Sequence, residues 1–355
     1  MKKLRLYAGA TARKRLGEEG FSPDLFSLML GASGGPKWLA LARMDQVVFG
    51  HWLPQRREPI HAYGTSIGSW RHACFAQADS TAALRRMEKH YVEQRYSARP
   101  SPQEVSNECR RILTEVLGAE GAQAIVHNPR VITHVGTNRG RGLTAALSKG
   151  GQGVGLAAAA LANAVGRTWL ELFYQRVVFS SRGSFSATGM GLTDFSTETV
   201  PLNVSNLVDA LTASGSIPLV LDGVTGVADA PPGVYWDGGI VDYHHDLRSF
   251  SGEGLVLYPH FFPEVIPGWF DKAFKGRRPA EADFDRVLLI TPSQEFISTL
   301  PNGKIPDRKD FSRMETDERI TTWRRTLSET DALAEELASV LERNEPEAAL
   351  EPAPA

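Results

Sequence analysis

Short runs of hydrophobic residues alternate along this chain with longer segments in which hydrophobic positions recur every three or four residues. The short runs are typical of buried strands, and the longer segments are typical of helices with one buried face. Strands are predicted at 25–32, 59–64, 130–137, 233–237, 254–260 and 285–293. Helices are predicted at 36–50, 66–78, 81–96, 102–117, 153–165, 203–218 and 312–343. This alternation favours an α/β fold in which a mainly parallel sheet is covered by helices on both faces.

The chain is predicted to form a single domain over residues 1–345. Its 355 residues are enough for one large hydrophobic core. A glycine-rich stretch leads from Asn138 into an alanine-rich helix, and we interpret the segment near 138–180 as an insertion that runs over the surface. Residues 346–355 are rich in Pro, Ala and Glu, and we expect them to form a disordered tail.

The composition argues against several classes of protein. The formal net charge is −2, which gives no electrostatic reason to expect nucleic-acid binding. The only cysteines are Cys74, expected to be a buried thiol, and Cys109, so a disulfide scaffold is excluded. The N-terminus lacks the apolar stretch of a signal peptide, and the longest apolar run, 153–165, is too short to span a bilayer. We therefore expect a cytoplasmic protein, with peripheral contact at membranes left open.

Three segments leave alternatives open. The alanine-rich helix at 153–165 fits a core helix, and it also fits a surface helix close to a lipid substrate. The stretch at 258–270 is dense in aromatic residues and proline, as in a lid or lipid-touching surface, but a buried connection would have the same composition. Arg176 and Arg182 either approach a substrate head group or are ordinary surface charges.

Polar motifs follow several of the predicted strands directly. "SGGPK" begins at Ser33, "GTSIG" centres on Ser66, and "DGG" begins at Asp237. Ligands of α/β proteins bind at the carboxyl ends of the strands, so these motifs are expected to meet at one edge of the sheet.

Ser66 lies in a G-x-S-x-G pattern between a predicted strand and a predicted helix. This is the pattern of a nucleophile elbow, which holds a serine hydroxyl at a sharp strand-to-helix turn. The alternative is a glycine-rich turn in which Ser66 or Thr65 only caps the helix. We predict that Ser66 is the nucleophile, which requires a base nearby.

The "SGGPK" turn at the start of a helix is predicted to supply oxyanion donors. Gly34 and Gly35 can present backbone amides without side-chain obstruction, and Lys37 adds positive charge suited to an anionic head group. A nucleotide-binding loop is the alternative interpretation. However, "GASGGPK" has neither the G-x-x-x-x-G-K-[ST] nor the G-x-G-x-x-G spacing.

The base for Ser66 is the open question. A Ser–His–Asp triad would need one of the histidines, and none stands in a distinctive motif. The candidates are His61, His72, His134, His244, His245 and His260. Asp237 instead ends an apolar strand, and the glycines that follow allow another part of the backbone to approach closely. Asp-Gly-Gly is also an ordinary turn sequence.

Taken together, these residues resemble the patatin-like phospholipase family in four blocks that occur in the same order. "SGGPKW" is similar to the family's G-G-G-x-[KR]-G loop, although Ser33 and Trp38 depart from it. "GTSIG" matches the elbow, "ASGSIP" at 213–218 matches an A-S-x-x-x-P segment, and "DGG" matches D-G-[GA]. The blocks span most of the chain, from Leu28 to about Asp242, and the ordered set is more specific than any one motif.

The resemblance implies a three-layer α/β/α sandwich and a Ser–Asp dyad without histidine. Asp237 would be the base for Ser66, and an acyl-enzyme on Ser66 would hydrolyse ester bonds in lipids. It further implies an oxyanion hole at the amides of Gly34, Gly35 and Ile67, a substrate-binding role for Lys37, and motif glycines at Gly64, Gly68, Gly238 and Gly239. No cofactor, metal or calcium is implied.

Two other functions compete with this prediction. The first is an α/β-hydrolase esterase with a triad whose histidine follows Asp237, namely His244, His245 or His260. The second is a lipid-binding protein that kept the fold and lost the activity. The sequence leaves the lipid class, the acyl chain length and the oligomeric state open.

Overall fold

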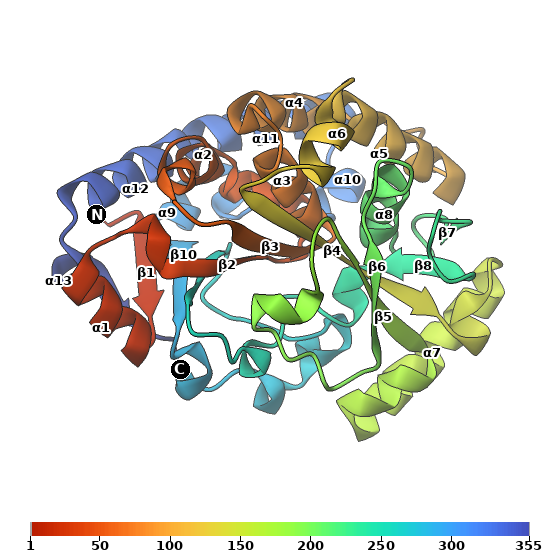
Figure 1. Cartoon of the computed structure of the whole chain (residues 1–355). Helices are drawn as coiled ribbons and strands as arrows, with labels where there is room; N and C mark the ends of the chain where they lie inside the picture. Colours follow the sequence, from red (N-terminus) through yellow and green to blue (C-terminus); the bar gives the residue numbers. More distant parts are fainter. Residues whose placement is uncertain (1, 355) are drawn as a thin grey trace.

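The computed structural model describes residues 2–354 and shows one large mixed sheet with helices packed around it (Figure 1). The sheet has 11 strands in the order β11-β1-β10-β9-β2-β3-β4-β5-β6, with β8 paired to β4 and β7 to β8. Most neighbouring pairs are parallel; β1/β10, β4/β5, β4/β8 and β7/β8 are antiparallel. The predicted α/β class with a mainly parallel sheet is confirmed.

The strands are β1 (Leu4–Ala8), β2 (Phe26–Gly31), β3 (Ile60–Thr65), β4 (Val131–Gly140), β5 (Tyr174–Ser180), β6 (Thr197–Pro201), β7 (Val224–Thr225), β8 (Val234–Asp237), β9 (Leu255–Pro259), β10 (Val287–Pro292) and β11 (Leu350–Pro352). The helices are α1 (Ala10–Glu19), α2 (Ala42–Val47), α3 (Ile67–Phe75), α4 (Ser80–Val92), α5 (Pro102–Leu117), α6 (Gly121–Val126), α7 (Lys149–Val165), α8 (Leu207–Gly215), α9 (Gln294–Thr299), α10 (Asp310–Arg313), α11 (Thr316–Glu329), α12 (Asp331–Arg343) and α13 (Pro346–Ala349). In Figure 1, α3, α4, α5 and α11 lie above the sheet, and α7 lies below it with several irregular connections.

The central strands β2 and β3 decide where the candidate site forms. Both are apolar runs buried on the two faces of the sheet, as parallel strands between helical layers usually are. They pair in parallel with Gly31 opposite Gly64, so the two strands end side by side. The segments that follow them, the "SGGPK" turn and the Ser66 elbow, therefore start from neighbouring positions.

The two ends of the chain add strands that the hydrophobic pattern did not predict. β1 pairs antiparallel with β10, and β11 pairs in parallel with β1, Leu6 lying opposite Leu350. Residues 346–352 were expected to be disordered, and that prediction is wrong because they form α13 and β11. Glu351 makes ion pairs with Lys2 and Arg5, which the composition of the tail does not reveal.

The segment predicted as an insertion near 138–180 contains an excursion at 141–173 between the antiparallel strands β4 and β5, and its two ends belong to those strands. Its helix α7 buries small or amide side chains, such as Ala159 and Asn163, and exposes Leu161 and Val165, which are 72% and 80% accessible. The helix is therefore a surface element rather than a core helix. Among residues 2–354, no helix is both long and apolar enough to cross a membrane.

The long helix expected at 312–343 is divided into α10, α11 and α12. The break between α11 and α12 falls at Thr330, whose hydroxyl donates a hydrogen bond to the Leu327 carbonyl at 2.7 Å. Side-chain hydrogen bonds of this kind compete with the backbone bonds of a helix. In contrast, α5 begins and ends where the sequence predicted.

A buried ion pair fixes the helix after the elbow. Arg71 on α3 donates two hydrogen bonds, both of 2.6 Å, to the carboxylate of Asp45 on α2. Both side chains are almost fully buried, so removing either partner would leave an uncompensated charge at a cost of about 3–5 kcal/mol. The pair joins α3, which follows Ser66, to α2, which follows the "SGGPK" turn.

Candidate functional site

Ser66 occupies a strained turn between β3 and α3. Its φ of 53° and ψ of −130° lie outside the regions that a residue with a side chain normally adopts. Such strain costs about 1–3 kcal/mol and persists where the surroundings enforce it. Its hydroxyl does not cap α3, so the capping alternative is wrong for Ser66. The geometry is that of a nucleophile elbow.

The structure brings Ser66 and Asp237 together although they are 171 positions apart. Ser66 Oγ donates a hydrogen bond to Asp237 Oδ2 at 2.8 Å. Asp237 is the last residue of β8, and its other oxygen accepts the Gly239 amide at 2.7 Å. Both side chains are buried, at 4% and 5% accessibility. A carboxylate held at this distance is positioned to remove the serine proton.

The surroundings of Asp237 increase its basicity. Burial raises the pKa of its carboxyl, because the charged form loses hydration. The charge of Arg308, the hydrogen bonds from Ser66 and Gly239, and the charge of Lys272 lower the pKa but do not cancel the effect of burial. Asp237 is therefore a stronger base than an exposed aspartate.

A single segment, the "ASGSIP" block, positions both members of the pair. Ser214 Oγ accepts a hydrogen bond from the Ser66 amide at 2.9 Å and donates one to the Gly136 carbonyl at 2.7 Å. The Ser216 carbonyl accepts the Asp237 amide at 2.8 Å. The sequence flagged this block only through the family resemblance, and the structure gives it a positioning role.

Asn138 orients the turn that carries Asp237. Its side-chain amide donates to the carbonyls of Asp237 and Gly238 at 2.8 and 3.0 Å. Asn138 lies on β4 and is fully buried. No motif in the sequence pointed to it, because its role depends on the antiparallel pairing of β4 with β8.

The predicted oxyanion donors Gly35 and Ile67 line the same cavity as Ser66, and Gly34 lines the adjoining cavity with Asp237. Gly35 begins a short 3-10 helix, Gly35–Ala40, that follows β2, and Ile67 begins α3. Within residues 2–354 the amides of Gly34, Gly35 and Ile67 have no protein acceptor. The Ser33 amide, by contrast, donates to the Tyr243 carbonyl at 2.8 Å. Ser33, where the turn departs from the G-G-G-x-[KR]-G pattern, therefore offers no free amide, whereas the two glycines after it do.

The four motif glycines lie where backbones approach closely. Gly64 and Gly68 lie on either side of the elbow, and a side chain on Gly68 would collide with β2. Gly238 lies against the Gly136 carbonyl, and Gly239 lies against the Ser33 side chain. These contacts hold the end of β8, with Asp237, against the middle of β4 and the residues that follow β2.

None of the histidines takes the place of Asp237. Among the described residues, no histidine nitrogen is hydrogen-bonded to Ser66 or Asp237. His61 and His134 bond each other at 2.9 Å, and His245 bonds the Gly31 carbonyl at 3.0 Å. Burial lowers the pKa of His244, His245 and His72, and lowers that of His134 and His260 to about 3. These rings are therefore neutral core side chains.

Two cavities meet at the pair. The first, which we call the apolar cavity, has a volume of about 320 Å³ and is lined by Ser66 and Ile67 with mostly apolar side chains such as Trp70 and Phe311. The second, the basic cavity, has a volume of about 530 Å³. It is lined by Asp237 and Gly34 and by the cations Lys37, Lys272, Arg308 and Lys309. Ile217, Val220 and Arg308 line both cavities.

Lys37, which was predicted to bind substrate, lines the basic cavity. Its ammonium group lies 5.1 Å from the ring centres of both Phe261 and Phe262. Burial lowers the pKa of Lys37. Sequence reasoning missed Lys272 and Arg308, which come from irregular segments with no motif.

Two other candidates from the sequence lie elsewhere. Arg176 is buried and pairs with Asp242 at 2.7 Å and with Asp194 at 3.0 Å, so it does not reach a head group. Arg182 donates to the Pro129 carbonyl at the surface. The aromatic stretch 258–270 is a largely buried connection; among its aromatic residues Trp269 is exposed, at 43%, and it lines the basic cavity.

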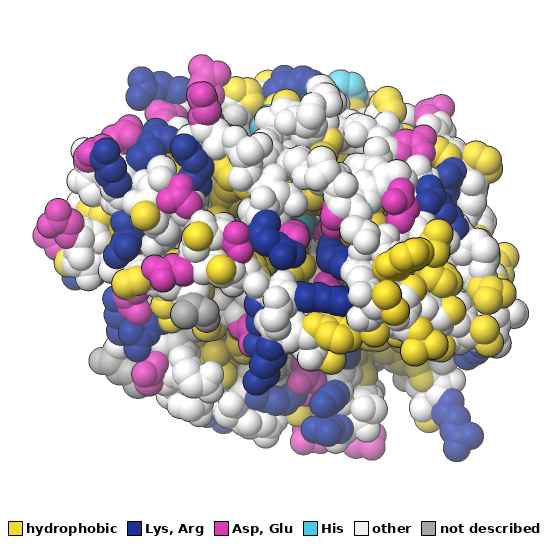
Figure 2. Space-filling model, turned by 90° about the horizontal axis from the view of Figure 1, so that it is seen from below, with side chains coloured by type: hydrophobic (Ala, Val, Ile, Leu, Met, Phe, Trp, Pro, Cys, Tyr) yellow, Lys and Arg dark blue, Asp and Glu magenta, His cyan; other side chains and the backbone are white. Residues whose placement is uncertain are grey.

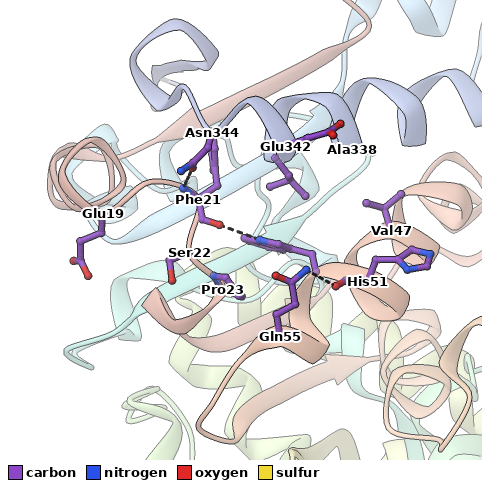
Figure 3. A pocket seen from close by; sticks show the side chains of 12 residues that line it. Glu19, Phe21, Ser22, Pro23, Val47, His51, Gln55, Ala338, Glu342 and Asn344 are labelled. Atoms are coloured by element: carbon purple, nitrogen blue, oxygen red, sulfur yellow. Dashed lines mark hydrogen bonds between the residues drawn. The ribbon is translucent and has the colours of Figure 1, made fainter.

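A further hollow of about 650 Å³ lies away from these residues, between the α1–β2 connection, the helical turn at 48–52 and the end of α12. Figure 3 shows that some of its residues form hydrogen bonds with one another. Trp52 donates to the Phe21 carbonyl at 3.0 Å, and Asn344 accepts the Phe21 amide at 2.6 Å. This hollow contains no paired nucleophile and base.

Comparison with known proteins gives no family for the chain. It matches no protein-family model, and no curated protein or solved structure matches it at a significant level. Among residues 2–354, no three His, Cys, Asp or Glu side chains lie close enough to hold a metal ion. The function must be argued from the site itself.

Proposed function

We propose that this chain is a serine acyl hydrolase of the patatin-like type, which cleaves carboxylic ester bonds in lipids. The observation that carries the proposal is the 2.8 Å hydrogen bond from Ser66 Oγ to Asp237 at a strained elbow. The free amides of Gly34, Gly35 and Ile67 around that elbow support it. A serine beside a base and beside oxyanion donors is the minimal equipment for acyl transfer.

In the first half of the proposed reaction, Asp237 takes the proton of Ser66 as Oγ attacks the ester carbonyl carbon. The carbonyl oxygen becomes an oxyanion that accepts hydrogen bonds from the loop amides. The bond to the alcohol oxygen then breaks, and Asp237 returns the proton to that oxygen. The alcohol leaves, and the acyl group remains on Ser66.

In the second half, water replaces the alcohol. Asp237 takes a proton from the water as its oxygen attacks the acyl carbon. The bond to Ser66 Oγ breaks, Ser66 recovers the proton, and the carboxylic acid leaves. Because burial raises the pKa of Asp237, the carboxylate holds a proton more readily in both halves than an exposed aspartate would.

The surroundings of Ser66 favour a lipid as the acyl donor. The apolar cavity begins at Ser66 and Ile67 and is lined by residues such as Trp70, Ile112 and Phe311. An acyl chain bound there would lose contact with water along its length, at a gain of about 0.8 kcal/mol per buried methylene. A small polar ester would gain little from the same walls.

An exposed apolar surface on α7 and its neighbours supports peripheral contact with a lipid surface. We define this surface by its exposed large apolar side chains, which are Leu143, Leu147, Val154, Leu161, Val165, Trp169, Leu172, Leu219, Val220 and Trp269. Its members Leu219, Val220 and Trp269 also line the basic cavity, so the surface is continuous with the opening towards Asp237. Figure 2 shows hydrophobic side chains gathered over the part of the molecule where α7 lies in Figure 1. Patches of this kind mark interaction sites.

The double substitution Leu161→Glu with Val165→Glu is expected to reduce binding to phosphatidylcholine vesicles by about tenfold or more, because two charges would enter the apolar boundary. Vesicle co-sedimentation measures the effect. Gln103→Glu, an exposed change on α5, is the matched control and should leave binding unchanged. Equal sedimentation of both variants would show that α7 does not contact the lipid.

Labelling with a fluorophosphonate tests the proposed nucleophile directly. The wild-type chain is expected to gain one adduct on Ser66 by intact mass and peptide mapping, and Ser66→Ala is expected to gain none. The hydroxyl attacks phosphorus and displaces fluoride, so labelling requires an activated serine. A folded wild-type chain that never reacts would favour the alternative of a lipid-binding protein without catalytic activity.

A further inference from the structure

We infer that the basic cavity binds a phosphate monoester carried by the alcohol part of the ester, so that the preferred substrates are monoacylglycerol phosphates rather than neutral glycerides. This inference rests on the proposed function and adds a substrate class to it. Three observations support this inference. Cations line the cavity, these cations have no ion-pair partners, and the cavity adjoins Asp237, beside the ester bond that would be cleaved.

Charge is unevenly distributed in the basic cavity. The charged residues that line it are the cations Lys37, Lys272, Arg308 and Lys309 and the carboxylates Asp237 and Asp307. The lining therefore carries two more positive than negative charges when Asp237 is ionised. That excess complements a phosphate monoester, which carries about −1.5 to −2 charges at neutral pH.

The cations of the cavity have no ion-pair partner in the described part of the chain. No side-chain nitrogen of these four cations comes within 4.0 Å of a carboxylate oxygen, although the backbone amide of Lys309 donates to Asp307 at 2.7 Å. The carboxylates whose charges raise the pKa of Lys37 are already paired, because Asp307 pairs with Lys304 and Glu264 pairs with Arg278. A charged cluster without internal partners is available to an anionic ligand.

Lys272 is held in place by aromatic rings rather than by an opposite charge. Its ammonium group lies 4.1 Å from the ring centre of Tyr243 and 5.3 Å from that of Trp269. Lys272 is exposed overall, but partial desolvation of its ammonium group, followed by the charges of Lys37 and Arg308, lowers its pKa to about 8. The three cations are thus close enough to repel one another, and a shared anion would relieve that repulsion.

The position of the basic cavity selects the alcohol part of the substrate. Ser66 lines the apolar cavity, whereas Asp237 and Gly34 line the basic one, and Arg308 lies at the boundary. An acyl chain in the apolar cavity leaves the alcohol on the side of Asp237. Asp237 is also the group that returns a proton to the departing alcohol, so an anion on that alcohol would lie among the cations.

Substrate preference tests the inference in the full chain. We compare kcat/KM for 1-oleoyl-glycerol 3-phosphate and for 1-oleoyl-glycerol, which share one acyl chain. The wild type is expected to prefer the phosphate, and Lys272→Met is expected to lower that preference about tenfold, mainly through KM, because a charged hydrogen bond is lost. Lys275→Met removes an exposed lysine from the same segment outside the cavity and should keep the wild-type preference. A wild type without preference overturns the inference, and so does a preference that Lys272→Met leaves intact.

A binding measurement separates this inference from the proposed hydrolysis. The Ser66→Ala chain, and the same chain carrying Lys272→Met, are titrated with sn-glycerol 3-phosphate and with inorganic phosphate. Binding of glycerol 3-phosphate that weakens about tenfold with Lys272→Met supports the site, even if the wild type fails to react with fluorophosphonate. Stronger binding of inorganic phosphate than of glycerol 3-phosphate, without any substrate preference, would assign the cavity to free phosphate and overturn the substrate class. No binding of either anion overturns the site itself.

Discussion

Asp237→Asn is expected to lower kcat/KM for an ester substrate by about 10²–10⁴-fold, the usual contribution of a general base. The amide has almost the size and shape of the carboxylate but cannot accept a proton from Ser66 Oγ, which lies 2.8 Å from Asp237 Oδ2. Steady-state hydrolysis and the rate of fluorophosphonate labelling should both fall. Asp317→Asn, at an exposed position on α11, is the control and should behave as the wild type does.

The same variant is expected to keep or increase its thermal stability. Burial raises the pKa of Asp237 in the folded state, so the folded chain binds that proton more tightly than the unfolded chain does. At a pH above the raised pKa, ionised Asp237 therefore reduces stability, and the neutral amide removes that penalty. Lost activity at unchanged or higher melting temperature would separate a chemical role from a structural one. Full turnover in Asp237→Asn would contradict the dyad and reopen the histidines.

The pH dependence of activity follows from the raised pKa of Asp237. Asp237 must be ionised to act as a base, so kcat/KM falls as the pH drops through its raised pKa. The acid limb should consequently lie above the usual aspartate value of about 3.9. The buried histidines do not produce this limb, because burial lowers the pKa of His260 and His134 to about 3. A limb at the ordinary aspartate value would mean that Asp237 is open to water.

The parts of the site that could be predicted from sequence are those fixed by short-range rules. Ser66 lies where an apolar strand turns into a helix, and Asp237 ends another apolar strand. The rule that strand ends in a parallel sheet collect at one edge indicated the pair. In the structure β8 runs antiparallel to β4, and Asp237 reaches Ser66 because it pairs with Thr137, next to the residue opposite Thr65. The motif glycines were visible for the same reason, since close backbone approach leaves a sequence signature.

The remaining features depend on contacts between distant segments. Lys272 and Arg308 lie in irregular connections without hydrophobic period or motif, so only the folded chain shows that both line the basic cavity. The side chains of α7 were ambiguous, because an alanine-rich helix gives little contrast between its faces. Strand β11 was missed because its pairing with β1 joins the two ends of the chain.

The substitution Gly68→Ala is expected to lower the free energy of unfolding by about 3 kcal/mol, at the upper end of the usual cost of overpacking. A Cβ atom on Gly68 would lie 2.1 Å from the carbonyl oxygen of Gly31, an atom of the β2 backbone. Neither β2 nor α3 can move easily. Strand β2 pairs with β3 and β9, and the Asp45–Arg71 ion pair anchors α3. Fluorophosphonate labelling should also slow, since pushing α3 away from β2 displaces Ser66 and the Ile67 amide from the amides of Gly34 and Gly35.

The matched control for this substitution is Gly17→Ala. Gly17 is an exposed helical position in α1, and a Cβ atom there meets nothing within 4 Å. Alanine is better than glycine in a helix by about 0.5–1 kcal/mol, so this variant should be slightly more stable than the wild type. Urea unfolding should show that the same glycine-to-alanine change lowers the free energy of unfolding at position 68 and raises it slightly at position 17. If Gly68→Ala instead matched Gly17→Ala in stability and labelled at the wild-type rate, then α3 would not touch β2 at the elbow, and the amides on β2's loop would be too far from Ser66 to stabilise an oxyanion.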